Sequence, residues 1–404
     1  MGSDHERRNV VTPYSRRLLD TNPTCTDAGR LLTSLCETPF VFTSPVVDGS
    51  VALYGVGNMG QMARDYFGFL KIPISCVIDQ RFESIPNEGR WNGIPAFSPT
   101  TAPINIRKDA LLAVCVATSP YVELADTLRA SGWRKVAPFY DISESYRARH
   151  PLSNGWYAPP FTENESMMIR HVLSQWADDR SRAHHLQFVA WRRLRQEWIL
   201  STAEVIPENR FFIPEIVSTL GSNEYFVDVG AHVGSISHRF LAEVNNQFYR
   251  IVAIEPDSRN RTALSSSLSQ VENRNRIEVL PHIIGATHAP CDFFEGLGYP
   301  SQRCEFGDTK ATMVTLDELD LSPTVLKLHL EGWELEALKG ATKTIERCRP
   351  IIMATSYHNA LGLWELPHWL MSNCEQYSFY MRQHTWCGTG CVIYAIPSEK
   401  VTAA

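Results

Sequence analysis

Two segments of this chain each combine an apolar strand, a glycine-containing turn and the start of a helix. They are "VALYGVGNMGQMARDYFGFL" (51–70) and "YFVDVGAHVGSISHRF" (225–240). A strand that enters a helix through a tight glycine turn is typical of the opening of a βαβ unit, and strands and helices continue to alternate after each segment. Because this alternation requires parallel strands and right-handed crossovers, we predict an α/β protein with two doubly wound, Rossmann-like domains.

Changes in composition divide the 404 residues into four predicted parts. An N-terminal arm (1–45) is polar and punctuated by Pro and Thr, with one helical candidate at 27–36. The first Rossmann-like domain follows (46–150), and a stretch rich in Pro, Gly and aromatic residues leads into a helical linker (151–215). The second α/β domain takes up residues 216–400.

The second α/β domain contains seven predicted strands and four predicted helices. The strands are expected at 225–229, 250–255, 277–284, 324–330, 350–356, 377–382 and 391–396, and the helices at 235–245, 258–270, 332–346 and 362–372. The last two strands are close in sequence, so they are expected to pair antiparallel. A parallel sheet with a terminal antiparallel hairpin is the layout of the class I methyltransferases.

Composition excludes several classes of function. The formal charge is −6 and acidic and basic residues are interspersed, so the sequence shows no basic cluster that would bind nucleic acid or an anionic membrane. The first residues lack the apolar core of a signal peptide, and no apolar run is long enough to span a bilayer. Ten cysteines include no pair spaced by two residues, and Cys387 and Cys391 flank two glycines of a predicted hairpin turn. A cytoplasmic protein is therefore expected.

The first glycine turn fits G-x-G-x-x-G at Gly55, Gly57 and Gly60, and Asp79 ends the next strand. Glycines in such a turn allow a pyrophosphate to approach the backbone, and an acid at the next strand end accepts hydrogen bonds from ribose hydroxyls. The turn can equally serve close packing of helix on strand alone. Nucleotide binding and a purely structural role both remain open.

The second glycine turn has a different chemistry. Glycines occur at 230 and 234, but His232 fills the position where a pyrophosphate needs bare backbone. A ligand without phosphates that carries an amino-acid tail and a ribose fits this turn better, and S-adenosylmethionine (SAM) is such a ligand.

Two acids and the turn itself are the candidate cofactor contacts. Asp228 at the first strand end could order the turn and meet the methionyl ammonium, and Glu255 could accept hydrogen bonds from both ribose hydroxyls. Backbone N–H groups of Ala231–Gly234 could face the carboxylate at the helix N-terminus. Alternatively, the two acids only cap strand ends. Two acids at successive strand ends beside a glycine turn favour the cofactor.

Five segments in order carry a resemblance to a known family. They are "FVDVGAHVGSIS", "VAIEPD", "VTLDEL", "LKLHLEGWELEALKGA" and "CRPIIMATSYHN". They resemble the FkbM family of SAM-dependent methyltransferases, over roughly residues 205–397. The resemblance implies a class I fold, SAM as cofactor, and methylation of hydroxyl groups on sugars or secondary metabolites. It also implies that Asp257 of "VAIEPD" belongs to the cofactor site. The domain around Gly55 lies outside the match.

Candidate catalytic residues follow the fourth and fifth strands of the second domain. In "KLHLEGWE" the side chains of Lys327, His329 and Glu331 alternate onto one face, with Glu331 at the lip of the sheet. In "TSYHN", His358 and Asn359 would lie beside the same crevice. His329 and His358 can accept a hydroxyl proton near neutral pH.

Each candidate also has a structural interpretation. His329 could be a buried, hydrogen-bonded histidine, and His358 with Asn359 could cap a loop. Trp333 and Trp364 are expected to pack rather than to bind a ligand. The resembling family usually has Asp where this chain has His329, which puts an Asp-dependent metal in doubt. We therefore predict no obligatory metal.

Three functions remain in view. The first is a SAM-dependent O-methyltransferase acting on a small-molecule or glycan hydroxyl, without nucleic-acid or membrane partners. The sequence leaves its oligomeric state open, with a homodimer as one option. The second is an NAD(P)-dependent oxidoreductase that uses Gly55–Asp79, although no hydride-transfer constellation accompanies that turn. The third is a non-catalytic protein that binds SAM or a nucleotide-linked sugar.

Overall fold

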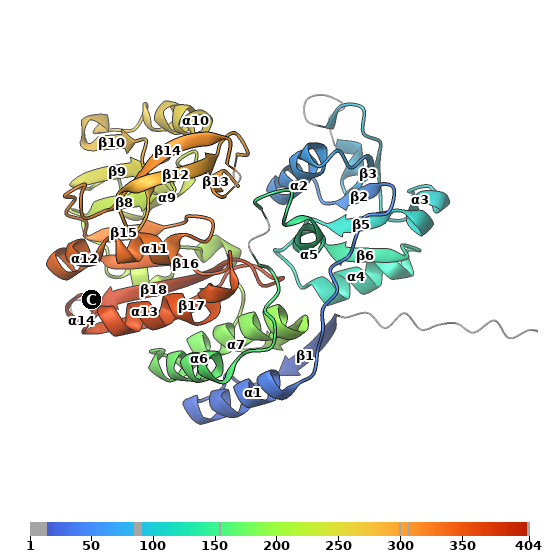
Figure 1. Ribbon diagram of the computed structural model, residues 1–404, viewed down its shortest axis with the longest axis horizontal. Coiled ribbons are helices and arrows are strands. Elements are labelled where there is room, and N and C mark those ends of the chain that lie inside the picture. Colours follow the sequence, from blue (N-terminus) through green and yellow to red (C-terminus); the bar gives the residue numbers. More distant parts are fainter. Residues whose placement is uncertain (1–13, 85–90, 153–154, 299, 306, 402–404) are drawn as a thin grey trace, which may run out of the picture.

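The computed structural model describes residues 14–84, 91–152, 155–298, 300–305 and 307–401. Two α/β domains lie side by side, and a helical segment packs beneath both of them (Figure 1). No helix within these ranges is both long and apolar enough to cross a bilayer.

The C-terminal domain is built on a seven-stranded sheet with the order β10-β9-β8-β15-β16-β18-β17. Its strands are β8 (Tyr225–Val229), β9 (Arg250–Ile254), β10 (Ile277–Leu280), β15 (Val325–Leu328), β16 (Ile351–Thr355), β17 (Tyr377–Gln383) and β18 (Cys391–Pro397). The five strands from β10 to β16 are parallel, and β18 runs antiparallel to both of its neighbours. The predicted fold class is confirmed, and the last strand inserts between β16 and β17.

In the described part of this domain there are six α-helices. They are α9 (Ser235–Glu243), α10 (Ser258–Leu268), α11 (Glu334–Lys339), α12 (Thr342–Cys348), α13 (Glu365–Asn373) and α14 (Ser398–Val401). The single helix expected at 332–346 is two helices, because the chain turns at Gly340 between α11 and α12. The first of them begins at Glu334, so Glu331 lies in the loop before α11.

A small sheet that the sequence did not predict is inserted between β10 and β15. Its strands are β11 (Ile283–Ile284), β12 (Ala289–Phe294), β13 (Gln302–Arg303) and β14 (Thr309–Val314), in the order β11-β14-β12-β13. The expected single strand at 277–284 was wrong, because the pairing of β10 with β9 ends at Leu280, immediately before Pro281. Proline has no N–H to donate to the sheet, so the chain leaves the main sheet there and β11 pairs with β14 instead.

The N-terminal domain has a five-stranded parallel sheet with the order β4-β3-β2-β5-β6. Its strands are β2 (Val51–Tyr54), β3 (Ile74–Ile78), β4 (Ala96–Phe97), β5 (Leu111–Val114) and β6 (Lys135–Pro138). Its helices are α2 (Asn58–Phe69), α3 (Ile104–Asp109), α4 (Tyr121–Ala130) and α5 (Phe139–Ser143). The short elements β4 and α3 were not predicted.

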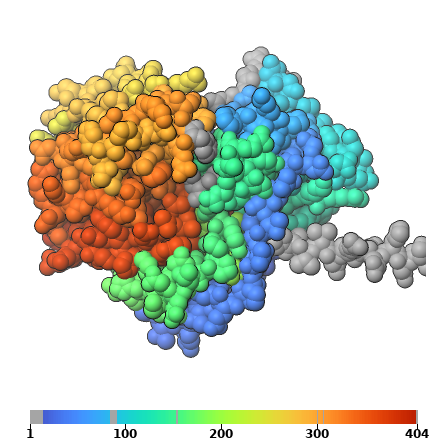
Figure 2. All heavy atoms as spheres, in the orientation of Figure 1, coloured from blue at the N-terminus to red at the C-terminus, as the bar shows by residue number. Residues whose placement is uncertain are grey.

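The start of the chain packs onto the helical segment that connects the domains. α1 (Cys25–Glu37) contacts α6 (Glu163–Gln175) and α7 (Asp179–Leu194), and β1 (Ser15–Leu19) pairs with β7 (Gln196–Leu200). In Figure 2 this blue arm runs from the N-terminal domain down to the green helices. α7 also packs on β17, and the short helix α8 (Pro214–Val217) leads into β8. The core of the methyltransferase-like sheet is therefore continuous with that of the helical segment.

Candidate functional site

The turn after β8 passes directly against the end of β15. Gly230 and Gly234 have positive φ values of 74° and 91°. A Cβ on Gly230 would collide with the carbonyl oxygen of His329, so glycine is what lets the two chain segments approach so closely. Parallel pairing of β8 with β15 brings both carboxyl ends to one edge of the sheet, where open α/β sheets bind ligands.

Asp228 supports this turn from below. It is fully buried, its Oδ1 lies 2.8 Å from Nζ of Lys327, and its Oδ2 accepts a hydrogen bond of 2.7 Å from Ser237. Lys327 in turn donates to the carbonyl oxygen of Gly230 at 2.7 Å. Asp228 orders the turn as expected, but its carboxylate oxygens face Lys327 and Ser237 rather than the cavity above.

The N–H groups of the turn are mostly bonded within the protein. Those of Gly230 and Ala231 donate to the carbonyl of Ile254, and that of Gly234 donates to Ala231. The expected contact of these groups with a ligand carboxylate stays a prediction, and the first turn of α9 contributes Ser235 and Ile236 to the cavity lining.

Glu255 follows β9 and is buried beside the turn. Its Oε2 accepts a hydrogen bond of 2.8 Å from the backbone N of His232, and its Oε1 accepts one of 3.0 Å from the backbone N of Asp257. Burial raises the pKa of Glu255 to about 7, although these hydrogen bonds act in the opposite direction. Burial also lowers the pKa of His232 to about 4.

Asp257 caps the N-terminus of α10. Its Oδ1 accepts from the backbone N of Arg259 and Asn260, and its Oδ2 accepts from the N of Gly296 and the hydroxyl of Ser301 at 2.7 Å each. It therefore ties the start of α10 to the loop that covers the site, and it does not line the cavity.

A cavity of about 220 Å³ joins these features to the end of β15. Its walls come from the glycine turn, β9, β15 and the small sheet. Its lining residues include Gly230, Ala231, His232, Glu255, Lys327, His329, Glu331, Ile283, Phe293, Gln302 and Arg303. Predicted cofactor contacts at 230–232 and 255 thus share one cavity with two predicted catalytic residues, whereas Asp228, Gly234 and Asp257 support it from behind.

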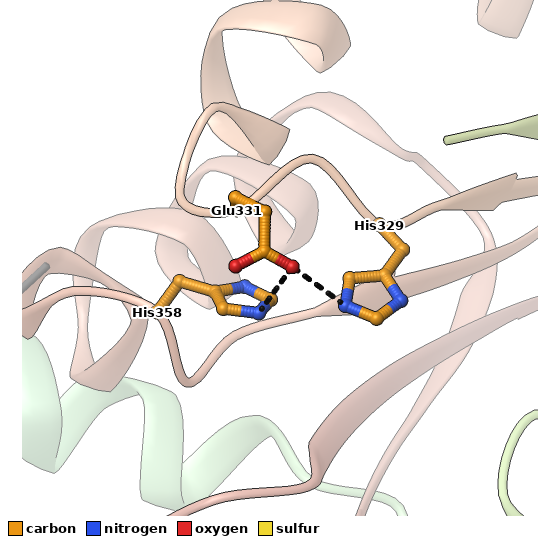
Figure 3. Close-up of side chains that lie close together, drawn as sticks. All are labelled: His329, Glu331 and His358. Carbon is orange, nitrogen blue, oxygen red and sulfur yellow. Dashed lines mark ion pairs between the residues drawn. The ribbon is translucent and has the colours of Figure 1, made fainter. Parts of the chain in front are cut away.

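The three predicted catalytic residues form one cluster. Oε1 of Glu331 lies 3.4 Å from Nε2 of His329 and 3.5 Å from Nε2 of His358. Figure 3 shows the carboxylate between the two imidazole rings, with both contacts converging on the same oxygen. The backbone of Glu331 has a φ of +52°, a left-handed conformation that costs energy for a residue with a Cβ.

Glu334, which was not among the predicted site residues, orients this cluster. Its Oε1 lies 3.1 Å from Nδ1 of His358 and accepts from the hydroxyl of Thr355 and the backbone N of Leu330, while Oε2 accepts from Gly332. Burial would raise the pKa of Glu334, but His358 and these hydrogen bonds hold it below its usual value. The signal that the sequence offered for this role was an acidic residue next to the apolar residues of α11.

Arg210 and Tyr357 complete the cluster and were missed. Arg210 donates to the Tyr357 hydroxyl at 2.8 Å, and that hydroxyl lies 3.4 Å from Nε2 of His329. Burial holds the pKa of His329 well below its usual value and raises that of Glu331. Arg210 belongs to the segment before β8, where no periodic pattern points to a function.

The N-terminal glycine turn is also formed as expected between β2 and α2. A Cβ on Gly60 would collide with the carbonyl oxygen of Gly55, whereas a Cβ on Gly57 would have no neighbour within 4 Å. Asp79 follows β3 and accepts a hydrogen bond from the backbone N of Arg81 at 2.9 Å. Close packing therefore accounts for Gly60, and nucleotide binding by this turn stays a prediction.

Comparisons with known proteins bear on the family and on the fold of the chain. Residues 228–379 match the family model described as methyltransferase FkbM domain. The crystal structure of Methyltransferase FkbM from Methylobacillus flagellatus KT aligns with a TM-score of 0.59 and 19% identity, covering 92% of this chain and 99% of that chain. That alignment shows that the two proteins share a fold over nearly their whole lengths.

Two further solved structures show weaker likeness. Precorrin-6y C5,15-methyltransferase from Geobacter metallireducens GS-15 has a TM-score of 0.28 and 14% identity, covering 49% of this chain and 96% of that chain. A Podospora anserina methyltransferase bound to SAH has a TM-score of 0.29 and 13% identity, covering 69% of this chain and 97% of that chain. A search of curated proteins gives no match. The resemblance of the C-terminal domain to the FkbM family, predicted from the sequence, is confirmed by the match of residues 228–379 to that family model.

Proposed function

We propose that this chain, whose residues 228–379 are a methyltransferase FkbM domain, transfers a methyl group from SAM to a hydroxyl group of a sugar or secondary metabolite. One observation carries the proposal: Glu255 and the glycine turn share a single cavity with His329 and Glu331. The donor and the acceptor of a methyl group must meet in one such space, since the transfer is a direct displacement.

The donor end of the cavity suits an adenosyl sulfonium without phosphates. Glu255 is buried at the end of β9, and each carboxylate oxygen has accepting capacity beyond the backbone hydrogen bond that it already makes. It can therefore bind the two ribose hydroxyls. His232 lies on the cavity wall where a pyrophosphate would need bare backbone. The N-terminal start of α9, which also lines the cavity, is placed to face the carboxylate of the methionyl part of SAM.

At the acceptor end, the hydroxyl is placed beside His329 and Glu331. As the oxygen–carbon bond forms, the carbon–sulfur bond breaks, sulfur keeps the electron pair as a thioether, and the hydroxyl proton is released at the cluster. Alignment of the two reactants can supply about 7–11 kcal/mol of the barrier. Assistance in removing the proton is worth roughly 10²–10⁴ in rate.

A larger groove offers a path for the acceptor. It has a volume of about 930 Å³, lies between α2 and the loops after β8 and β9, and shares His232, Asn260 and Gly298 with the cavity. Its α2 side presents Gln61, Arg64, Asp65 and the half-exposed ring of Phe69. Polar donors and acceptors beside one aromatic face are suited to a polyhydroxylated ligand, so we assign part of acceptor binding to the N-terminal domain.

Calorimetric titration of SAM into the wild type and Glu255→Ala tests the donor site. The variant loses the carboxylate that binds both ribose hydroxyls, so we expect SAM to bind about 10–100-fold more weakly. Glu278→Ala is the matched control, because that acid lies on the neighbouring strand β10 outside the cavity. Unchanged affinity in Glu255→Ala would reject the assigned site.

A labelled-methyl screen against glycans, nucleotide sugars and hydroxylated metabolites tests the reaction. Methylation of a hydroxyl in at least one class is the expected result, and it should disappear when acceptor hydroxyls are blocked. If SAM binds but none of these acceptors is methylated, the non-catalytic alternative replaces this proposal.

A further inference from the structure

We propose that His329, Glu331 and His358 bind one divalent transition-metal cation, which holds the acceptor hydroxyl during methyl transfer. From the sequence we predicted no metal, because His329 stands where the resembling family usually has Asp. In the structure, however, the three side chains lie close enough together to hold a cation. The role of the cation rests on the proposed function, whereas its binding does not.

The three side chains converge as metal ligands do. One ligand atom from each lies within 4.8 Å of the other two, and the carboxylate oxygen is 3.4 and 3.5 Å from the two imidazole nitrogens. Ligands about 2.1 Å from a tetrahedral ion lie roughly 3.4 Å apart. In Figure 3 both nitrogens point at the same oxygen, so a small adjustment would place a cation among the three atoms.

The partners of His358 fix its ring for this task. Glu334 accepts hydrogen bonds from Thr355, Leu330 and Gly332, so it serves as an acceptor and holds the His358 proton on Nδ1. The ring nitrogen left to act as a ligand is then Nε2, which faces Glu331. A carboxylate bound to the outer nitrogen of an imidazole is the usual support of a metal-ligating histidine.

The position of Glu331 is also imposed by its surroundings. Its backbone is left-handed, and Asn359 donates a hydrogen bond of 2.8 Å to the carbonyl of the next residue, Gly332. Strained backbone of this kind persists where the structure enforces it, commonly at functional sites. Here it directs the carboxylate toward the two histidines.

The charges around the cluster favour a cation. The carboxylate of Glu334 is buried and that of Glu331 is partly buried, and Lys327 is compensated by Asp228 at 2.8 Å. Arg210 is the opposing charge, but its guanidinium is directed at the Tyr357 hydroxyl. A cation would thus neutralise acids that are otherwise costly to bury.

One side of the cluster remains open to the cavity. His329 and Glu331 line it, and their side chains are 20% and 16% exposed. Three protein ligands with an open position are typical of catalytic rather than structural sites, and two imidazoles with one carboxylate favour Zn²⁺, Fe²⁺ or Mn²⁺ over Mg²⁺.

The cation would act on the acceptor before methyl transfer. Coordination of the hydroxyl oxygen would lower its pKa, and because the imidazole nitrogens would then be bound to the cation, the proton would pass to solvent water rather than to the cluster. The resulting alkoxide attacks the methyl carbon, the carbon–sulfur bond breaks, and the electron pair stays on sulfur. No oxidant or reductant is needed.

Binding is tested on the full chain after dialysis against a chelator. Titration with Co²⁺, followed by visible absorption, should show one ion per chain, with ligand-field bands that Zn²⁺ abolishes by displacement. Glu331→Gln and His329→Ala should each weaken Co²⁺ binding at least tenfold, and Glu334→Gln should weaken it about 10–100-fold by releasing His358. His288→Ala is the control, because His288 forms an exposed pair with Glu318 and should bind Co²⁺ as the wild type does.

Two results would overturn the inference. One is a wild-type chain that takes up no stoichiometric Co²⁺ or Zn²⁺, a measurement that depends on no variant folding. The other is binding that survives both Glu331→Gln and His329→Ala. Methyl transfer on the same chelated and reloaded samples separates the two proposals: activity unaffected by chelation rejects the cation alone, whereas bound cation without SAM binding or transfer rejects the proposed function alone.

Discussion

Glu255 combines two properties that oppose each other, burial and the need to accept hydrogen bonds from a ribose. Burial raises its pKa to about 7. The nearby charged groups are Asp257, which adds negative charge, and Arg261, which binds the Glu255 backbone carbonyl at 3.1 Å. His232 stays neutral because its own pKa is lowered to about 4. The ionised form of Glu255 is therefore only half populated near neutral pH.

This pKa predicts how SAM affinity depends on pH. Two ribose hydroxyls donate best to an ionised carboxylate, and with a pKa of about 7 the ionised fraction rises from about one tenth at pH 6 to about nine tenths at pH 8. Affinity should therefore increase about tenfold over that range, measured by calorimetry. Glu255→Gln cannot ionise and should show a flatter profile; a slope equal to that of the wild type would contradict the assignment.

The raised pKa of Glu255 also makes the stability of the protein depend on pH. Its contribution to stability falls as the pH rises, whereas SAM affinity is expected to increase. Native Glu255 binds its proton more tightly than the unfolded chain does, because its pKa is raised from 4.5 to about 7. Its stabilising contribution is present below about pH 4.5 and is lost as the pH rises through about 7. Ligand binding and folding thus favour different protonation states of one residue, as is common at functional sites.

Among the site residues, the sequence predicted the ones that directly follow strands of the sheet. It did not predict the ones that come from helices or irregular segments. Glu255, His329, Glu331 and His358 were found because parallel strands bring their carboxyl ends to one edge. Arg210 reaches the site from an irregular segment, which carries no periodicity to interpret. Glu334 was not among the predicted site residues, because its contact with His358 depends on the tertiary fold.

At the scale of elements, long periodic segments were predictable and short ones were not. Both glycine turns, α2, α4, α9 and α10 follow from hydrophobic spacing and turn chemistry. β4, β11 and β13 have only two residues each, too few for any alternation to show. Their pairing is set by contacts distant in sequence, which is also why the small sheet over the cavity was missed.

The N-terminal glycine turn allows packing and nucleotide binding to be separated by a pair of variants. Gly60→Ala forces a Cβ onto the carbonyl oxygen of Gly55, so α2 must move from β2 and stability should fall by about 2–4 kcal/mol. Gly57→Ala has open space and should change stability by less than about 1 kcal/mol. Denaturant unfolding measures both effects.

Nucleotide binding makes a different demand on the same pair. A pyrophosphate needs bare backbone at Gly57, so NADH binding that Gly57→Ala abolishes without loss of stability would favour the nucleotide interpretation. Absence of NADH binding in the wild type would leave packing as the role of the turn. Equal stability losses in the two variants would contradict the packing argument for Gly60.

At the scale of the whole molecule, buried arginines of the helical segment connect parts that are distant in sequence. Arg192 donates to the carbonyls of Gly155, Tyr357 and Gly388, joining the linker to the end of β16 and to the β17–β18 turn. Arg195 pairs with Asp141 of α5, its Nη2 being 2.8 Å from Oδ1. The helical segment is therefore the support that fixes both α/β domains.

The Asp141–Arg195 pair predicts how strongly the N-terminal domain is coupled to the rest. Tyr14 also donates to Asp141 at 2.9 Å, and both members of the ion pair are almost fully buried. Asp141→Asn leaves the Arg195 charge buried without its partner, so the free energy of unfolding should fall by about 3–5 kcal/mol. The exposed pair of Asp126 and Arg129 is the matched control. Asp126→Asn should lower the free energy of unfolding by only about 0.2–1 kcal/mol. Because Asp141 does not line the cavity that contains Glu255, SAM affinity in the folded variant should match that of the wild type, and calorimetry alongside denaturant unfolding checks both statements. Equal losses of stability in the two variants would mean that the buried pair does not couple the domains.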